Sequence, residues 1–157
     1  MKTEEKKNLN KWINKINNTI QSFLLTIDEE YTCEMGKDFC AYTDLDMINW
    51  SIIYTDKSGI NFYNNFINRF PIAKNFNLFT LSILHEIGHL ETENEMYDDT
   101  NINIDKLTDN QYFALHNEKI ATDWAGEWIE NNFDKAKKIN TILTNILESG
   151  YNKLLIE

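Results

Sequence analysis

The amino-acid sequence predicts an α+β fold in a single domain that spans residues 1–157. Apolar residues recur at helical spacing in long segments near both ends of the chain. The stretch from residue 39 to residue 70 is instead rich in β-branched and aromatic residues, which are typical of strands. No internal repeat or low-complexity linker divides the chain. We therefore expect four helices packed on a small sheet of about three strands, antiparallel or mixed.

The first predicted helix covers residues 5–28. Its apolar residues follow one another at intervals of three and four, which places them on one face of a helix. These residues are Leu9, Trp12, Ile13, Ile16, Ile20, Phe23, Leu24 and Ile27. The stripe is most simply a face that packs on the core.

The predicted sheet lies within residues 39–70. The segments "WSIIYT" and "INFYNNF" suggest two strands near 50–55 and 60–66, and "DFCAYT" suggests a third strand before them. The intervening "DKSG" is typical of a turn, with Gly59 available for a positive φ. We expect a β-hairpin here, closed off by Pro71.

Three further helices are predicted after the sheet. The second covers 75–91, begins at Asn75 or Asn77, and is apolar on nearly every side, so it should be buried. The third covers 109–131, because "TDNQ" matches a capping box at its start. The fourth covers 134–149 and should end at Gly150.

Composition excludes two classes of function. The formal charge is −10, from 25 acidic and 15 basic residues, so the chain is not expected to bind nucleic acid. No apolar run approaches the length of a membrane span, and the N-terminus lacks the apolar segment of a secretion signal. We expect a cytoplasmic protein in which Cys33 and Cys40 are free thiols, although a disulfide between them is compatible with the sequence. The many Asn and Ile residues and the single Arg are typical of AT-rich coding, as in a low-GC bacterium or a mobile element such as a phage.

The second helix carries the pattern H-E-x-x-H at residues 85–89. Residues four apart on a helix lie about one turn apart on the same face, so His85 and His89 can bind one zinc ion. Glu86 lies about 100° away from His85 around the helix axis, beside the metal. From there it can accept a proton from a water on the zinc. The simpler alternative is a pair of core histidines, but an apolar helix has little reason to bury three ionisable groups without a metal.

A catalytic zinc site needs a third protein ligand. Glu93 and Glu95 follow the motif closely, but a straight helix would spread residues 85, 89 and 93 over about 12 Å. Glu118, on the third helix, is the preferred candidate, because the small residues Ala121, Thr122 and Ala125 on its face allow a close approach. Tyr112 and His116, near the start of that helix, are candidates for the donor that stabilises the oxyanion.

Residues 50–128 resemble the ImmA/IrrE-type metallopeptidases. The resemblance is carried by "SGINFYN", by "FTLSILHEIGHL" and by "EKIATDWA". It implies a zincin-like metallopeptidase core and a third zinc ligand at Glu118. It also implies a narrow protein substrate, such as a helix-turn-helix repressor that controls a mobile element.

Two functions from different classes are thus predicted. The first is a zinc metalloendopeptidase with His85, His89 and Glu118 as ligands and Glu86 as general base. The second is a non-catalytic acidic protein, for example a phage-encoded inhibitor, that occupies a basic surface and in which the metal is structural.

Overall fold

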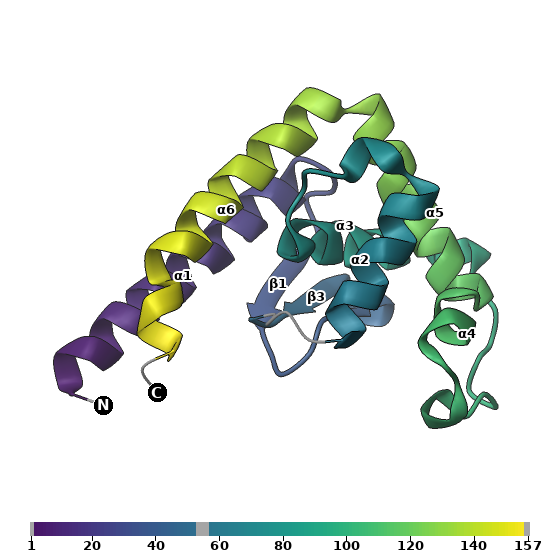
Figure 1. Ribbon diagram of the computed structural model, residues 1–157, viewed down its shortest axis with the longest axis horizontal. Helices are drawn as coiled ribbons and strands as arrows, with labels where there is room; N and C mark the ends of the chain where they lie inside the picture. Colours follow the sequence, from purple (N-terminus) through teal and green to yellow (C-terminus); the bar gives the residue numbers. More distant parts are fainter. Residues whose placement is uncertain (1, 53–56, 156–157) are drawn as a thin grey trace.

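The computed structural model describes residues 2–52 and 57–155, with side chains described as far as Gly150 (Figure 1). Within these ranges the chain forms a small sheet, several short 3₁₀ turns and six α-helices. The strands are β1 (Thr32–Met35), β2 (Cys40–Tyr42) and β3 (Met47–Trp50). The helices are α1 (Thr3–Leu25), α2 (Lys57–Arg69), α3 (Leu78–Glu91), α4 (Asp109–Phe113), α5 (His116–Asn131) and α6 (Phe133–Leu155). The α+β class is confirmed, but the predicted number of four helices is wrong.

The sheet is mixed, with strand order β1-β3-β2. β1 runs parallel to β3 with Cys33 opposite Ile48, and β2 runs antiparallel to β3 with Ala41 opposite Ile48. Cys33 and Cys40 therefore lie on strands separated by β3, about 9–10 Å apart. That separation exceeds the Cα–Cα distance of a disulfide, roughly 7 Å at most. Both thiols are accordingly free.

The predicted hairpin is wrong in its second strand. Residues 60–66 belong to helix α2, and the sheet is built from residues 32–50, including β1, which was not predicted. The first predicted strand, 50–55, falls partly on residues 53–56, which lie outside the described residues. Phe62, Phe66 and Phe70 recur every four residues, a helical spacing that the β propensity of their neighbours obscured. Tertiary packing of this aromatic face on the core decides the conformation.

The predicted third helix, 109–131, is two helices. The capping box is present, since Thr108 Oγ1 accepts from the backbone N–H of Gln111 and the Gln111 side chain accepts from the Thr108 N–H. The helix then breaks at Ala114, which caps the end of α4, and Leu115, whose φ of −58° and ψ of 141° are not helical and which caps the start of α5. The break therefore interrupts the predicted helix just before Glu118.

Helices α1 and α6 form a long antiparallel pair at one side of the molecule (Figure 1). The Trp12 indole N–H donates to the backbone oxygen of Ile146, 2.6 Å away, in the centre of this pair. Gly150 does not end the helix as predicted. A Cβ at Gly150 would lie 2.0 Å from the Trp12 ring, so glycine serves here to admit the indole. In the described ranges, no helix has both the length and the apolar character that a membrane span requires.

Helix α3 lies in the interior and positions the candidate site. Its start at Asn77 was predicted: the Asn77 side chain accepts from the Thr80 N–H at 2.6 Å. All residues from 79 to 88 are buried. On one side Phe79 packs edge-on against Trp50 of the sheet, with ring centroids 5.9 Å apart. Another side of α3 packs against α5.

Candidate metal centre

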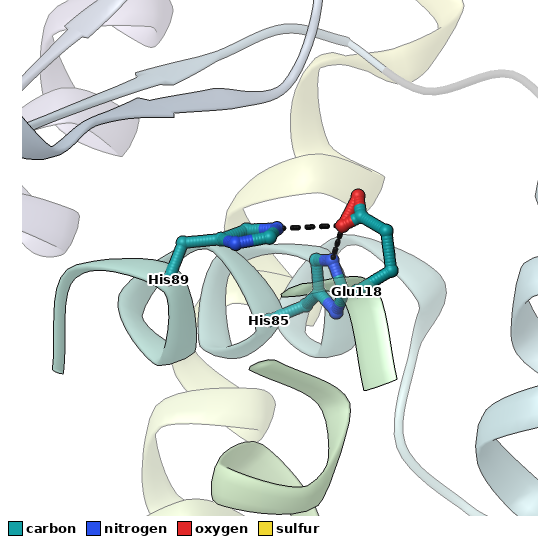
Figure 2. A group of neighbouring side chains, drawn as sticks. All are labelled: His85, His89 and Glu118. Carbon is teal, nitrogen blue, oxygen red and sulfur yellow. Dashed lines mark ion pairs between the residues drawn. The ribbon is translucent and has the colours of Figure 1, made fainter. Parts of the chain in front are cut away.

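His85, His89 and Glu118 converge on one point between α3 and α5 (Figure 2). Glu118 Oε2 lies 3.4 Å from His85 Nε2 and 2.8 Å from His89 Nε2. One ligand atom from each residue lies within 4.8 Å of the other two. The His85 and His89 side chains are 9% and 15% exposed and that of Glu118 is 12% exposed, so the cluster is shielded but open on one side.

Glu118 reaches the histidines because α5 approaches α3 very closely. A Cβ at Gly88 would lie only 2.3 Å from the backbone oxygen of Ala121, so glycine alone permits this spacing. Ala121 and Ala125 are fully buried at the contact. Glu118 stands in the first turn of α5, where the positive end of the helix dipole favours a carboxylate.

Thr122 fixes the orientation of the His85 ring. Thr122 Oγ1 lies 2.9 Å from His85 Nδ1, and both side chains are buried. When Nδ1–H donates to this hydroxyl, the lone pair of Nε2 points at Glu118 Oε2. A partner of this kind on the second ring nitrogen is typical of metal-ligating histidines. Phe62 holds the ring from the side, edge-on, with centroids 5.4 Å apart.

The donor set fits a metal ion. Glu118 Oε2 is buried and accepts no hydrogen bond of good geometry, although both Nε2 atoms lie close to it. A buried carboxylate oxygen that lacks a well-aligned hydrogen bond is unfavourable. A cation placed among this oxygen and the two ring nitrogens would satisfy all three atoms at once. The His85, His89 and Glu118 group can therefore hold a metal ion.

The same proximity shifts two pKa values. Burial opposes ionisation of Glu118, but the two imidazoles outweigh it and hold the pKa of the carboxyl well below its ordinary value. Burial would lower the pKa of His89, but the Glu118 carboxylate outweighs that effect and raises this pKa above its ordinary 6.5. Each of the two groups thus favours the charged form of the other.

Glu86 is buried beside the cluster without belonging to it. It is 8% exposed and lines the same cleft as His85. Burial raises the pKa of its carboxyl, and the nearby His85 and His89 offset this in part. Such a carboxyl exchanges a proton more readily near neutral pH than an exposed one.

Tyr112 is brought to the cluster, but as a partner of Glu118. Its hydroxyl donates to Glu118 Oε1 at 2.5 Å, leaving Oε2 to face the histidines. Burial and the Glu118 carboxylate raise the pKa of the phenol, which keeps its proton on this hydrogen bond. In a continuous helix residues 112 and 118 would lie about 9 Å apart along the axis and on different faces. The break between α4 and α5 is what lets them meet.

The remaining predicted residues lie elsewhere. His116 stacks on Tyr97, with centroids 3.6 Å apart, and its Nε2 lies 2.7 Å from the backbone oxygen of Glu95. It is not among the residues that line the cleft. Glu93 and Glu95 are exposed on a 3₁₀ turn and are not members of the cluster.

Two contributors were missed in the sequence. Thr122 was noted only for its size, although its place one turn after Glu118 on the same face was a usable signal that it could reach the site. Phe62 was predicted to lie in a strand, and nothing in the sequence then indicated that it would contact His85.

The cleft beside the cluster has a volume of about 390 Å³. Its walls come from α2, α3, α4 and the connection between β1 and β2, and its floor includes His85, Glu86 and Glu118. This volume lies within the range of small-ligand sites, roughly 300–1,000 Å³. The cleft is therefore large enough to receive part of a larger molecule beside His85 and Glu118.

Comparison of the chain with protein-family models, with curated proteins and with solved structures finds no match in any of the three.

Proposed function

We propose that the protein is a zinc-dependent endopeptidase that cleaves a specific intracellular protein. The observation that carries the proposal is the convergence of His85 Nε2, His89 Nε2 and Glu118 Oε2 on one shielded point beside a cleft that His85 and Glu118 line. Two imidazoles and one carboxylate are a ligand set of catalytic zinc, which needs three protein ligands and one open position. When bound, zinc supplies Lewis acidity that activates water and polarises a peptide carbonyl.

Glu86 is the proposed general base. It lies next to His85 in the sequence, is not a member of the three-residue cluster, and lines the cleft. Its raised pKa suits it to accept a proton from the attacking water and to deliver it to the leaving amine. Tyr112 and Thr122 orient the ligands Glu118 and His85 through the hydrogen bonds described above.

The proposed zincin-like fold and the proposed substrate both follow from the resemblance to the ImmA/IrrE-type metallopeptidases. A mixed sheet packed on the helix that carries H-E-x-x-H supports a zincin-like core. The proposed substrate is a helix-turn-helix repressor of a mobile element. Such a DNA-binding protein carries a basic surface, and the charge of −10 favours association with it.

The test is a comparison of the wild-type protein with Glu86→Gln. The substitution keeps the shape of the side chain and removes its basicity. It should leave about one zinc per chain, measured by elemental analysis, and lower the rate of substrate cleavage by roughly 10²- to 10⁴-fold. Glu95→Gln, on the exposed turn, is the matched control and should change neither quantity.

The high negative charge also supports a second function, a non-catalytic acidic protein that binds a basic surface. This alternative predicts that Glu86→Gln retains the full biological effect of the wild-type protein. That result would overturn the peptidase proposal.

A further inference from the structure

The first turn of α5, which carries Glu118, lacks the side-chain cap that usually fixes the start of a helix. The capping position is held by Leu115, an apolar residue whose side chain accepts no hydrogen bond. The N–H groups of a first turn have no partners within the helix, and a polar capping residue normally accepts from one of them. Helix ends without such contacts fray. Glu118 is the third residue of α5, so its position depends on contacts from elsewhere in the fold.

A short strap, residues 92–97, begins at the C-terminal end of α3. The buried Thr92 side chain donates to the backbone oxygen of Gly88, 2.7 Å away. The backbone N–H of Glu95 then donates to the Thr92 oxygen at 2.9 Å, which closes a tight turn. The strap is therefore anchored three residues after His89, on the helix that carries both histidines of the cluster.

Asn117 joins the other end of the strap to α5. Its Oδ1 accepts from the backbone N–H of Tyr97 and its Nδ2 donates to the Tyr97 backbone oxygen, both at 2.8 Å. The neighbouring His116 ring stacks on the Tyr97 ring, and its Nε2 donates to the backbone oxygen of Glu95 at 2.7 Å. A paired contact such as that of Asn117 fixes orientation as well as distance. The strap thus ties the end of α3 to the two residues of α5 that directly precede Glu118.

We propose that Asn117 is a positioning residue for the Glu118 carboxylate. Through the strap it holds the uncapped first turn of α5 in helical form, which keeps Glu118 Oε2 beside the two imidazole Nε2 atoms, 2.8 and 3.4 Å away. Tyr112 orients the carboxylate itself through Oε1, whereas Asn117 acts on the backbone that carries it. The inference deepens the proposed function, because it rests on the same three-residue metal centre.

Asn117→Ala tests the proposal in the full chain. The substitution removes both hydrogen bonds to Tyr97, but alanine has a higher helix propensity than asparagine, so the intrinsic helicity of α5 is not reduced. Zinc affinity, measured by competition with a chelator, should fall about 10-fold, the lower end of the effect of removing a partner that orients a metal ligand. In the metal-free protein, the backbone amides of residues 116–118 should exchange hydrogen several-fold faster, while exchange in α3 stays unchanged.

Asn132→Ala is the matched control. Asn132 is half-buried like Asn117 and also bonds the backbone of α5, but at the far end, where its Nδ2 donates to the backbone oxygen of Trp128 at 3.0 Å. It lies about 20 Å from Glu118 along the helix axis. Because the two sites are that far apart, Asn132→Ala should leave zinc affinity within about 2-fold of the wild type.

Leu115→Ser tests whether fraying of the first turn is the cause. A serine at the capping position can accept from the N–H of Asn117 or Glu118, so it caps the turn without the strap. Asn117→Ala should therefore lower zinc affinity about 10-fold in the wild type but less than about 3-fold in the Leu115→Ser background. Comparison within each background removes the cost of losing the half-buried leucine, which both members of the second pair share.

Three results would overturn the role of Asn117. They are a zinc affinity of Asn117→Ala within about 2-fold of the wild type, unchanged exchange at residues 116–118, and an equal loss of affinity in both backgrounds. Cleavage of substrate by the wild type together with any of these results would leave the peptidase proposal standing. A chain that binds zinc with the expected dependence on Asn117 but hydrolyses no substrate would support the positioning role and overturn only the peptidase proposal.

Discussion

Substituting Gly88 by alanine should separate Glu118 from the two histidines. Gly88 lies between His85 and His89 on α3 and faces the backbone of α5. The added Cβ would lie 2.3 Å from the backbone oxygen of Ala121, whereas carbon and oxygen in ordinary contact lie about 3.3 Å apart or more. The obstacle is backbone, so the strain cannot be relieved by turning a side chain.

The size of the displacement follows from these distances. Restoring normal contact requires α5 to move by about 1 Å at Ala121. Glu118 lies one turn earlier on the same helix, so its Oε2 should move by a similar amount relative to the Nε2 atoms, which now lie at 2.8 and 3.4 Å. Metal-ligand distances tolerate only about 0.2 Å of error, so the shift is roughly five times the tolerance. We expect zinc affinity to fall by at least 10- to 100-fold.

The effect on the fold should be smaller. Overpacking costs about 1–3 kcal/mol, and replacing glycine by alanine within a helix recovers about 0.5–1 kcal/mol. The metal-free variant should therefore remain folded, with its melting temperature lowered by a few degrees. Zinc affinity is measured by competition with a chelator, and stability by denaturant unfolding of the metal-free protein.

Gly126→Ala is the matched control. Gly126 also lies on α5 within a tight contact, but its Cβ would meet the side-chain ring of Phe70 at 2.2 Å. It should lower the free energy of unfolding without a comparable loss of zinc affinity. If Gly88→Ala is folded and binds zinc within about 3-fold of the wild type, the spacing of α3 and α5 does not position Glu118, and the reasoning fails.

Four further predictions concern the site and the core. Tyr112→Phe removes the hydrogen bond to Glu118 Oε1 and should lower zinc affinity about 10-fold while leaving the circular dichroism spectrum unchanged; equal affinity would contradict a positioning role. Zinc affinity should be measured from pH 5.5 to 8.5. It should rise until the pH passes the raised pKa of His89 and should then level off, because a proton on the imidazole competes with the metal. The stability of the metal-free protein should follow the opposite trend with pH. A histidine whose pKa is raised by folding stabilises the fold fully below its ordinary pKa of 6.5, and this stability is lost as the pH rises through the raised pKa. An affinity that does not change with pH would exclude His89 as a ligand. Leu84→Ala, at a fully buried position of α3, should lower the free energy of unfolding by about 2–5 kcal/mol in chemical denaturation, and a loss below 1 kcal/mol would place Leu84 outside a tightly packed core.

The parts of the fold predicted well are those in which neighbouring residues determine the conformation. The helix that carries His85 and His89 starts at Asn77, one of the two caps named from the sequence. Its apolar residues on every side correctly predicted burial. The helix cap and the apolar pattern both depend on residues within one or two turns of each other, so a short stretch of sequence is enough to predict them.

The errors arose where local propensity and tertiary packing disagree. Residues 60–66 have strand-forming side chains, yet the face that carries Phe62 and Phe66 packs as a helix. Gly150 has the usual place of a residue that ends a helix, yet α6 continues through it, and the glycine instead leaves space for Trp12, which is far away in sequence. Neither outcome can be read from the residues nearby.

The sequence by itself determined that two histidines and a glutamate share one turn of a buried helix, because helical periodicity is a short-range property. It narrowed the third ligand to Glu93, Glu95 or Glu118 but could only rank them. The tertiary structure alone brought Glu118 to the histidines, through the contact at Gly88 and through the break that turns Tyr112 back onto the carboxylate. The spacing between two helices and the direction of a chain after a break depend on contacts across the whole core, and no local pattern encodes them.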